Sequence, residues 1–239
     1  NGELGDGTTL SRMVPGDVIG LTSGAQAISA SSSHTCVIMD LGSVKCWGSK
    51  YGVVLGAGTT ETWWTPNDVI GMAAGVQSIN TDSEHTCAVT EEGGVKCWGG
   101  NYYGQLGDGT ESDRSTPVDV DGMNNGVQSV STGAEHTCAV TDVGGVKCWG
   151  RNYDGELGDG GMIGRGLTPG DVAGLTSGVQ AVSAGAGHTC ALTDAGGVKC
   201  WGVNESGELG DGTTEQRTTP VDVAGLTSSV VAVSAGDEH

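Results

Sequence analysis

An all-β fold, a β-propeller of four-stranded blades, is the fold class that this sequence predicts, and three observations predict it. First, variants of GELGDG recur with their leucines 51, 51, 51 and 52 residues apart, at Leu4, Leu55, Leu106, Leu157 and Leu209. Second, each period offers four short runs rich in Val, Thr, Ser and Trp between glycine-bearing turns. Third, no stretch has the apolar spacing of an amphipathic helix, and the 45 glycines disfavour long helices.

The rarer residues follow the same period, so the repeat did not arise by chance. Its phase is marked by the five histidines, His34, His85, His136, His188 and His239. The eight cysteines form four in-phase pairs, and a tryptophan directly follows the second cysteine of each pair, at Trp47, Trp98, Trp149 and Trp201. Self-similarity at a fixed period predicts a repeat architecture. We therefore take residues 1–239 as a single propeller or a segment of one.

One period, residues 115–151, shows the elements in order. Its sequence predicts strands at Thr116–Val120, Val127–Thr132, Thr137–Thr141 and Val146–Trp149, with glycine or a polar residue in each turn between them. Four strands per repeat, with one tryptophan in the last strand, favour a propeller over a sandwich or a barrel.

The segment GVQSVSTGAEHTCAVTDVGGVKCWGRNYDGELGDG resembles the repeat of the regulator of chromosome condensation family, a β-propeller built from blades of about this length. The resemblance covers essentially the whole chain. Members of that family range from nucleotide-exchange factors to inhibitors of β-lactamases and surface adhesion modules. The resemblance therefore implies the fold and no single activity.

Counted against this repeat, the chain holds four complete repeats and the first two strands of a fifth. Seven blades are common in the family, so we expect a segment of a longer propeller. The alternative is that a neighbouring molecule supplies the missing strands, because open half-blades expose strand edges.

Charge and hydropathy narrow the class of partner. The net charge is −19, with ten Lys and Arg residues in all, which disfavours nucleic acid and an anionic membrane surface as partners. No run of eighteen apolar residues occurs, so the sequence predicts no membrane insertion. A protein partner or a neighbouring subunit remains.

The cysteine pairs predict disulfides across a hairpin of each repeat. The pairs are Cys36 and Cys46, Cys87 and Cys97, Cys138 and Cys148, and Cys190 and Cys200. If the hairpin turn closes between the two cysteines, they face each other at a separation close to that of a disulfide. Buried free thiols are the alternative, and zinc is disfavoured because no C-x2-C pair exists. Disulfides would indicate an extracellular or cell-surface location.

The histidines and the acidic glycine loops invite catalytic or metal-binding interpretations. One histidine per repeat, always before Thr-Cys or at the end of the chain, favours a structural role, and no serine or cysteine stands outside the repeat as a nucleophile would. GELGDG lacks the spacing of a calcium loop, and Ala57 replaces the aspartate in the second copy. We expect turns held by glycines and aspartates, with no cofactor, no metal and no enzymatic activity.

Function is expected where the repeats differ. Two segments vary, one after LGDG and one after CWG, and variable loops on a rigid scaffold are the usual place of binding sites. Candidate partner-binding residues there are Trp63, Trp64, Tyr51, Tyr102, Tyr103, Tyr153 and Arg165. These aromatics could instead pack between blades or mediate contacts within a longer chain, and the sequence leaves open which propeller face is used.

The sequence thus predicts a non-enzymatic extracellular recognition module, with protein as the partner. The alternatives are a structural subunit whose open half-blades are completed by a neighbouring chain, and an intracellular exchange-factor-like regulator. Asn204–Ser206 also has the form of a glycosylation sequon.

Overall fold

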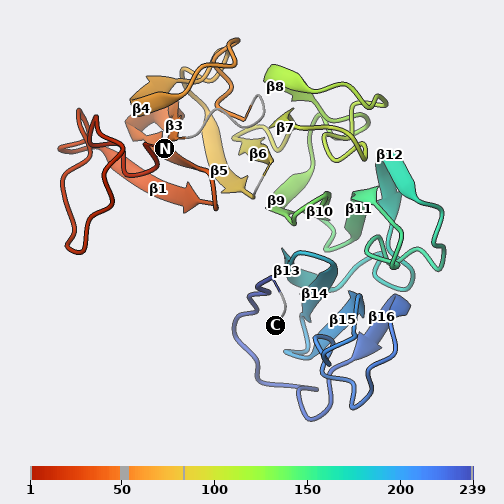
Figure 1. The fold of residues 1–239 in the computed structure, drawn as a ribbon. Coiled ribbons are helices and arrows are strands. Elements are labelled where there is room, and N and C mark those ends of the chain that lie inside the picture. The colour runs from red at the N-terminus through yellow and green to blue at the C-terminus, as the bar shows by residue number, and fades with distance from the viewer. Residues whose placement is uncertain (1, 49–53, 83, 238) are drawn as a thin grey trace.

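The computed structural model describes residues 2–48, 54–82, 84–237 and 239. They form four antiparallel four-stranded sheets, the blades, which follow one another in an arc (Figure 1). The strands are β1 (Ala25–Ala30), β2 (His34–Met39), β3 (Val44–Gly48), β4 (Trp63–Asp68), β5 (Val76–Thr81), β6 (His85–Thr90), β7 (Val95–Gly99), β8 (Arg114–Asp119), β9 (Val127–Thr132), β10 (His136–Thr141), β11 (Val146–Arg151), β12 (Arg165–Asp171), β13 (Val179–Ala184), β14 (His188–Thr193), β15 (Val198–Gly202) and β16 (Arg217–Asp222).

The all-β propeller predicted from the sequence is confirmed. Each blade runs in chain order from an inner to an outer strand, and the inner strands β1, β5, β9 and β13 contact one another around the axis (Figure 1). One 3-10 turn, Asp40–Gly42, joins β2 to β3. Within the described ranges, no helix has the length and apolar character needed to cross a bilayer.

The strand order within a blade corrects one prediction. The sequence suggests that Trp149 lies in the last strand of its unit and that residues 116–120 open that unit. Instead, β8 is the outer strand of the preceding blade, and β11 is the third strand of its sheet, between β10 and β12. The strand that follows each long loop pairs with the strand that precedes the loop and carries the tryptophan. In the second blade, an ion pair of 2.5 Å between Lys96 and Asp119 also joins β7 to β8.

The same correction applies at the end of the chain. Residues 217–222, predicted to open a fifth blade, pair with β15 and complete the fourth sheet. Residues 230–237 carry no assigned strand, but the amide of Ala235 donates to Ser183 Oγ of β13 at 2.9 Å. The repeat in the sequence and the blade in the structure are therefore out of phase by one strand.

The core lies between blades, and tryptophan is its main component. One buried cluster joins Cys87, Cys97 and Leu106 of the second blade and its loop to Trp149 of the third. The indole N–H of Trp149 donates to the carbonyl of Gln105 at 2.9 Å, and Trp98 and Trp201 make the same bond to the loops before them. Each tryptophan thus fixes its blade to the preceding one.

Histidines link successive blades close to these tryptophans. Nε2 of each imidazole lies 2.7–2.8 Å from a threonine hydroxyl of the next blade, in the pairs His34–Thr86, His85–Thr137 and His136–Thr189. Burial lowers the pKa of His34 to about 4 and the pKa values of His85 and His136 to about 3. These side chains are neutral structural links, as the one-per-repeat pattern predicts.

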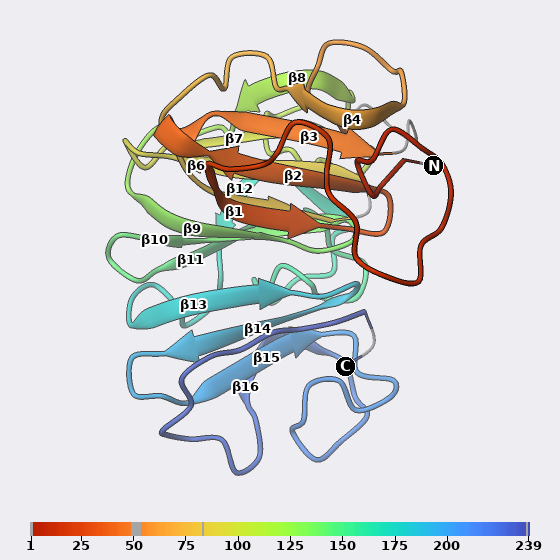
Figure 2. The ribbon, with the colours of Figure 1, turned by 90° about the vertical axis from the view of Figure 1, so that its left-hand side faces the viewer.

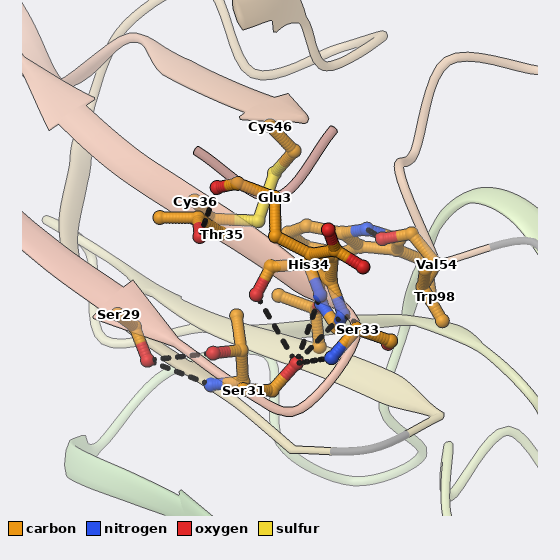
Figure 3. The surroundings of a disulfide bond; sticks show 12 residues. Glu3, Ser29, Ser31, Ser33, His34, Thr35, Cys36, Cys46, Val54 and Trp98 are labelled. Carbon is orange, nitrogen blue, oxygen red and sulfur yellow. Dashed lines mark hydrogen bonds between the residues drawn. A yellow bond between two sulfur atoms is a disulfide. The ribbon is translucent and has the colours of Figure 1, made fainter. Parts of the chain in front are cut away.

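Four disulfides bridge the second and third strands of the blades. They join Cys36 to Cys46, Cys87 to Cys97, Cys138 to Cys148, and Cys190 to Cys200. The two cysteines of each pair are direct cross-strand partners, with Cα atoms 4.1 Å apart. Figure 3 shows the first bridge beside His34, with Ser31 at the imidazole and Val54 at the indole of Trp98.

Strand direction separates the connections onto two faces. The turn after each first strand and the long loop after each third strand lie on one face, here called the loop face, for example residues 133–135 and 152–164. The turns between second and third strands, such as residues 142–145, lie on the opposite face, here called the hairpin face. Figure 2 shows the long loops on the right and the hairpins on the left. Both variable segments fall in or beside the long loops, so they share the loop face.

Candidate functional site

The acidic glycine loops are held together by their own side chains. In the second blade, Asp108 Oδ1 accepts from the amide of Thr110 at 3.0 Å and from its hydroxyl at 2.7 Å, while Arg114 binds Oδ2 at 2.7 Å. Burial works against ionisation, yet the bonds from Thr110 and Arg114 hold the pKa of Asp108 below its ordinary value. Both carboxylate oxygens are therefore engaged by the loop itself, as a structural turn requires.

A glycine and an asparagine complete this loop. Gly107 has φ +68°, and a Cβ there would stand 2.7 Å from Nε1 of Trp149, so a side chain would displace the tryptophan of the next blade. Asn101 is fully buried and donates to Thr110 O at 3.0 Å and to Ser112 O at 3.1 Å. In the described part of the chain, no three His, Cys, Asp or Glu side chains gather as a metal site would need.

The sequon residue Asn204 has the same role in the fourth blade. Its side chain is fully buried and donates to Thr213 O at 3.1 Å and to Glu215 O at 2.9 Å. A glycan on that nitrogen is incompatible with the folded loop, so the sequon marks a structural asparagine.

The first blade replaces the aspartate–arginine pair of this loop with apolar residues. Ala57 stands in the aspartate position, and Trp63 stands where the second blade has Arg114. Trp63 packs against the buried cluster between the first two blades, and its indole nitrogen is buried without a hydrogen-bond partner among the described residues. In the structure, Trp63 therefore takes part in the packing between the first two blades.

The third blade breaks the pattern in a different way. Arg165 lies six residues after Asp159, as Arg114 does after Asp108. Arg114 pairs with its aspartate, whereas Arg165 pairs with a glutamate of another blade. Its Nε lies 3.1 Å from Glu111 Oε1, and its Nη1 donates to the carbonyl of Tyr102 at 3.0 Å. Both partners belong to the loop of the second blade, so Arg165 joins two loops that the repeat alone would leave separate.

Three tyrosines lie at this junction of the second and third blades. The rings of Tyr102 and Tyr103 meet edge to face with centroids 4.8 Å apart, and Tyr103 meets Tyr153 in the same manner at 6.2 Å. Tyr102 is 68% exposed and Tyr153 50%. The guanidinium carbon of Arg151 lies 5.5 Å from the centroid of the Tyr153 ring, within cation–π range.

Arg151 also forms ion pairs with three carboxylates. It pairs with Glu135 at 3.4 Å, with Asp154 at 2.7 Å and with the fully buried Glu156. Burial raises the pKa of Glu156, although Arg151 opposes that shift. In the sequence, Ser49, Gly100 and Val203 stand in the place of Arg151 in the other three repeats, so only the third repeat supplies the arginine of this network.

Four of the seven candidate residues therefore come together. They are joined by Arg151, which was not among the candidates predicted from the sequence. Tyr102, Tyr103, Tyr153 and Arg165 form, with Arg151, what we call the loop-face cluster. Trp63 and Trp64 lie on β4 of the first blade, where Trp64 is about half exposed beside Gly2. Tyr51 lies outside the described residues. Comparing the repeats at position 151 would have revealed the arginine, because its counterparts in the sequence are serine, glycine and valine.

The Arg151–Glu156 pair can be tested for its contribution to stability. We expect Arg151→Ala to lower the free energy of unfolding by about 2 kcal/mol, because Glu156 is then buried without its cation. The double variant R151A/E156Q should recover most of this loss, since the second blade has the uncharged Gln105 in the place of Glu156, buried and accepting from the loop amide of Tyr103. Urea unfolding with intact disulfides measures both. Equal losses in the single and double variants would contradict the assignment.

Sequence comparisons place the repeats in a known family. One sequence model of the regulator of chromosome condensation (RCC1) repeat matches residues 92–140, 144–192 and 195–239. A second model of that repeat matches residues 25–50, 78–105, 127–156 and 179–208. Together the matched segments fall in all four blades.

Individual relatives are similar over most of the chain but are themselves longer. The ultraviolet-B receptor UVR8 of Arabidopsis thaliana is 32% identical over 216 residues, which are 89% of this chain and 49% of that protein. The E3 ubiquitin-protein ligase HERC2 of Homo sapiens is 32% identical over 219 residues, 89% of this chain and 4% of that protein. The chain thus spans about half of UVR8 and a small part of HERC2.

Solved structures share the fold. Human WBSCR16 superposes with a TM-score of 0.78 at 25% identity, covering 90% of this chain and 56% of that one. Yeast RCC1 (Prp20), solved bound to Kap60, gives 0.77 at 20% identity, covering 89% and 52%. The ectodomain of the Physcomitrella patens receptor kinase CR4 gives 0.55 at 21% identity, covering 94% and 48%.

Proposed function

The chain belongs to the regulator of chromosome condensation (RCC1) repeat family, and from this premise we propose that it is a non-enzymatic protein-recognition module that acts outside the cell or at its surface. One observation carries the proposal. On a scaffold built from repeated blades, the loop-face cluster is a group of aromatic and arginine side chains that departs from the repeat, and it exposes the rings of Tyr102 and Tyr153.

The chemistry of the cluster suits a protein partner. Tyrosine and arginine are enriched among the residues that dominate binding energy at protein interfaces. Tyrosine offers a large contact area with few rotatable bonds, and edge-to-face packing already orders these rings. A relative with the same fold, yeast RCC1, was solved bound to the protein Kap60, which supports recognition of proteins by the family.

Removing the exposed tyrosines tests the binding function. We expect Y102A/Y153A to weaken capture of the partner at least about tenfold, because it removes both exposed rings. The matched control is L41A/V143A on the hairpin face, where both side chains are more than two-thirds exposed. The amount of each protein retained by the immobilised wild-type chain is compared with the amount retained by each double variant. If the two double variants retain the same proteins in equal amount, the loop face is not the binding face.

The disulfides are the basis for proposing an oxidising location. Four bridges that each close a hairpin persist in secreted and surface proteins and are rare in the cytosol. The CR4 ectodomain shows that the fold occurs in an extracellular setting. Intact mass of the protein from its native source, with and without reductant, should differ by eight hydrogens. Eight free thiols would instead favour the intracellular exchange-factor-like alternative, and a native mass at a multiple of the chain would favour assembly with neighbouring subunits.

A further inference from the structure

The surroundings of the loop-face cluster carry an excess of negative charge. Arg151 and Arg165 are the two cations of the cluster, and both are already paired within the protein. Around them lie five carboxylates, Glu84, Glu111, Glu135, Asp154 and Glu156. Burial raises the pKa of Glu135, and the nearby charge of Glu84 raises it further, while Glu135 is the main cause of the raised pKa of Tyr103. Carboxylates of two blades therefore surround the two arginines of the cluster and outnumber them.

Exposed apolar side chains lie in the loop between Tyr153 and Arg165 of the same cluster. Met162 and Ile163 lie in the loop that carries Tyr153, and Ile163 is 82% exposed. The corresponding loop positions are polar in the neighbouring blades, with Glu111 and Ser112 in the second, and with Thr214 and Glu215 in the fourth. Methionine adapts its shape to different apolar surfaces. The third blade thus adds an apolar element beside the aromatic and acidic ones.

These features together specify the chemistry of a partner. We propose that the loop-face cluster binds an extended segment of a partner protein in which lysine or arginine side chains stand next to an apolar side chain. This rests on the protein-recognition function proposed above and adds the class of ligand. A cation that stacks on the exposed rings of Tyr102 and Tyr153 gains cation–π attraction, and the carboxylates of Glu84 and Glu135 add charge complementarity. The apolar side chain covers Met162 and Ile163.

The net charge of −19 supports the same choice of ligand. It repels acidic segments at long range and attracts basic ones, which speeds encounter at low ionic strength. Because surface charges are screened by salt, binding of such a segment must weaken as the salt concentration rises.

Selection from a random-peptide library on phage gives the first test. The library is panned on the immobilised wild-type chain with intact disulfides, after depletion on Y102A/Y153A, so that the recovered peptides depend on the cluster. We expect recovered peptides to carry lysine or arginine next to an apolar residue. Recovered peptides without basic residues would overturn the proposed ligand class and leave the recognition function standing. A panning that recovers no cluster-dependent peptide would overturn both.

Synthetic versions of the recovered peptides give the quantitative test by fluorescence anisotropy. We expect Kd to rise at least about tenfold for Y102A/Y153A and about threefold for E84Q and for E135Q. The matched control is Glu92→Gln on the hairpin face, an exposed glutamate far from the cluster in the blade, which should leave Kd unchanged. Replacing the basic residues of the peptide by glutamine should abolish its salt dependence. Equal affinity of E84Q, E135Q and E92Q would refute the acidic contribution and with it the proposal.

Discussion

Trp149→Ala is expected to lower the free energy of unfolding by about 4 kcal/mol, the largest effect of any single substitution considered for this protein. Trp149 is fully buried between the second and third blades, beside Leu106 and the bridged Cys87 and Cys97. The substitution leaves a large cavity, and it also removes the donor of the hydrogen bond to the buried carbonyl of Gln105. Urea unfolding of the oxidised protein measures the loss.

Two further variants separate the causes of this effect. Trp149→Phe keeps most of the volume but removes the indole N–H, so about half of the loss should remain. Trp64→Ala, at a half-exposed tryptophan of β4, should cost less than about 1 kcal/mol. If Trp64→Ala destabilised the protein as much as Trp149→Ala, the buried tryptophans would not be the main links between blades.

Acid should begin to destabilise the protein at pH values well above those at which carboxylates become protonated. Histidine has an ordinary pKa of 6.5, whereas burial lowers the pKa of His34 to about 4 and those of His85 and His136 to about 3. Between these values the unfolded chain binds more protons than the folded chain. Stability is therefore fully present above pH 6.5 and falls as the pH falls, by about 1.4 kcal/mol per pH unit for each histidine and about 4 for the three.

The contribution of one histidine can be isolated. Burial raises the pKa values of Glu135 and Glu156, so these groups act in the opposite sense at lower pH, and the comparison must be with a variant. His136→Gln retains a polar side chain opposite Thr189 and does not titrate. The free energy of unfolding, measured by urea at pH 7 and at pH 5, should fall by about 2 kcal/mol less in this variant than in the wild type. Superimposable slopes would refute the role of His136.

Much of the fold could be derived from the sequence because each sequence pattern occurs once in every repeat, and the copies support one another. A single C-x9-C pair is ambiguous, but four in-phase pairs beside four tryptophans identify one hairpin in each blade, and the structure pairs Cys138 with Cys148 directly across it. The phase of the blade could not be derived in this way. The repeat gives the order of β7, β8 and β9 along the chain, but it does not show whether β8 pairs with β7 or with β9. In the structure β8 pairs with β7.

The candidate site was predictable in part for a related reason. Tyr102, Tyr103, Tyr153 and Arg165 stood out because they lie in segments that vary between repeats. That they meet depends on Arg165 reaching from the third blade to Tyr102 of the second, a contact between residues 63 positions apart. Comparison of aligned repeats shows which positions differ, and it carries no information on contacts between different positions of neighbouring blades.

The placement of the disulfides has a mechanical consequence. Each bridge closes a hairpin within one blade, with a sequence separation of 10, and none of the four joins one blade to another. Under a pulling force, the interfaces between blades can therefore yield one after another, while the bridged hairpins stay shut. A blade of 51 residues would then lengthen by about 41 residues, or roughly 140 Å at about 3.4 Å per residue. Adding reductant should lengthen each step, so the oxidation state of the surroundings would set how far the protein extends under load.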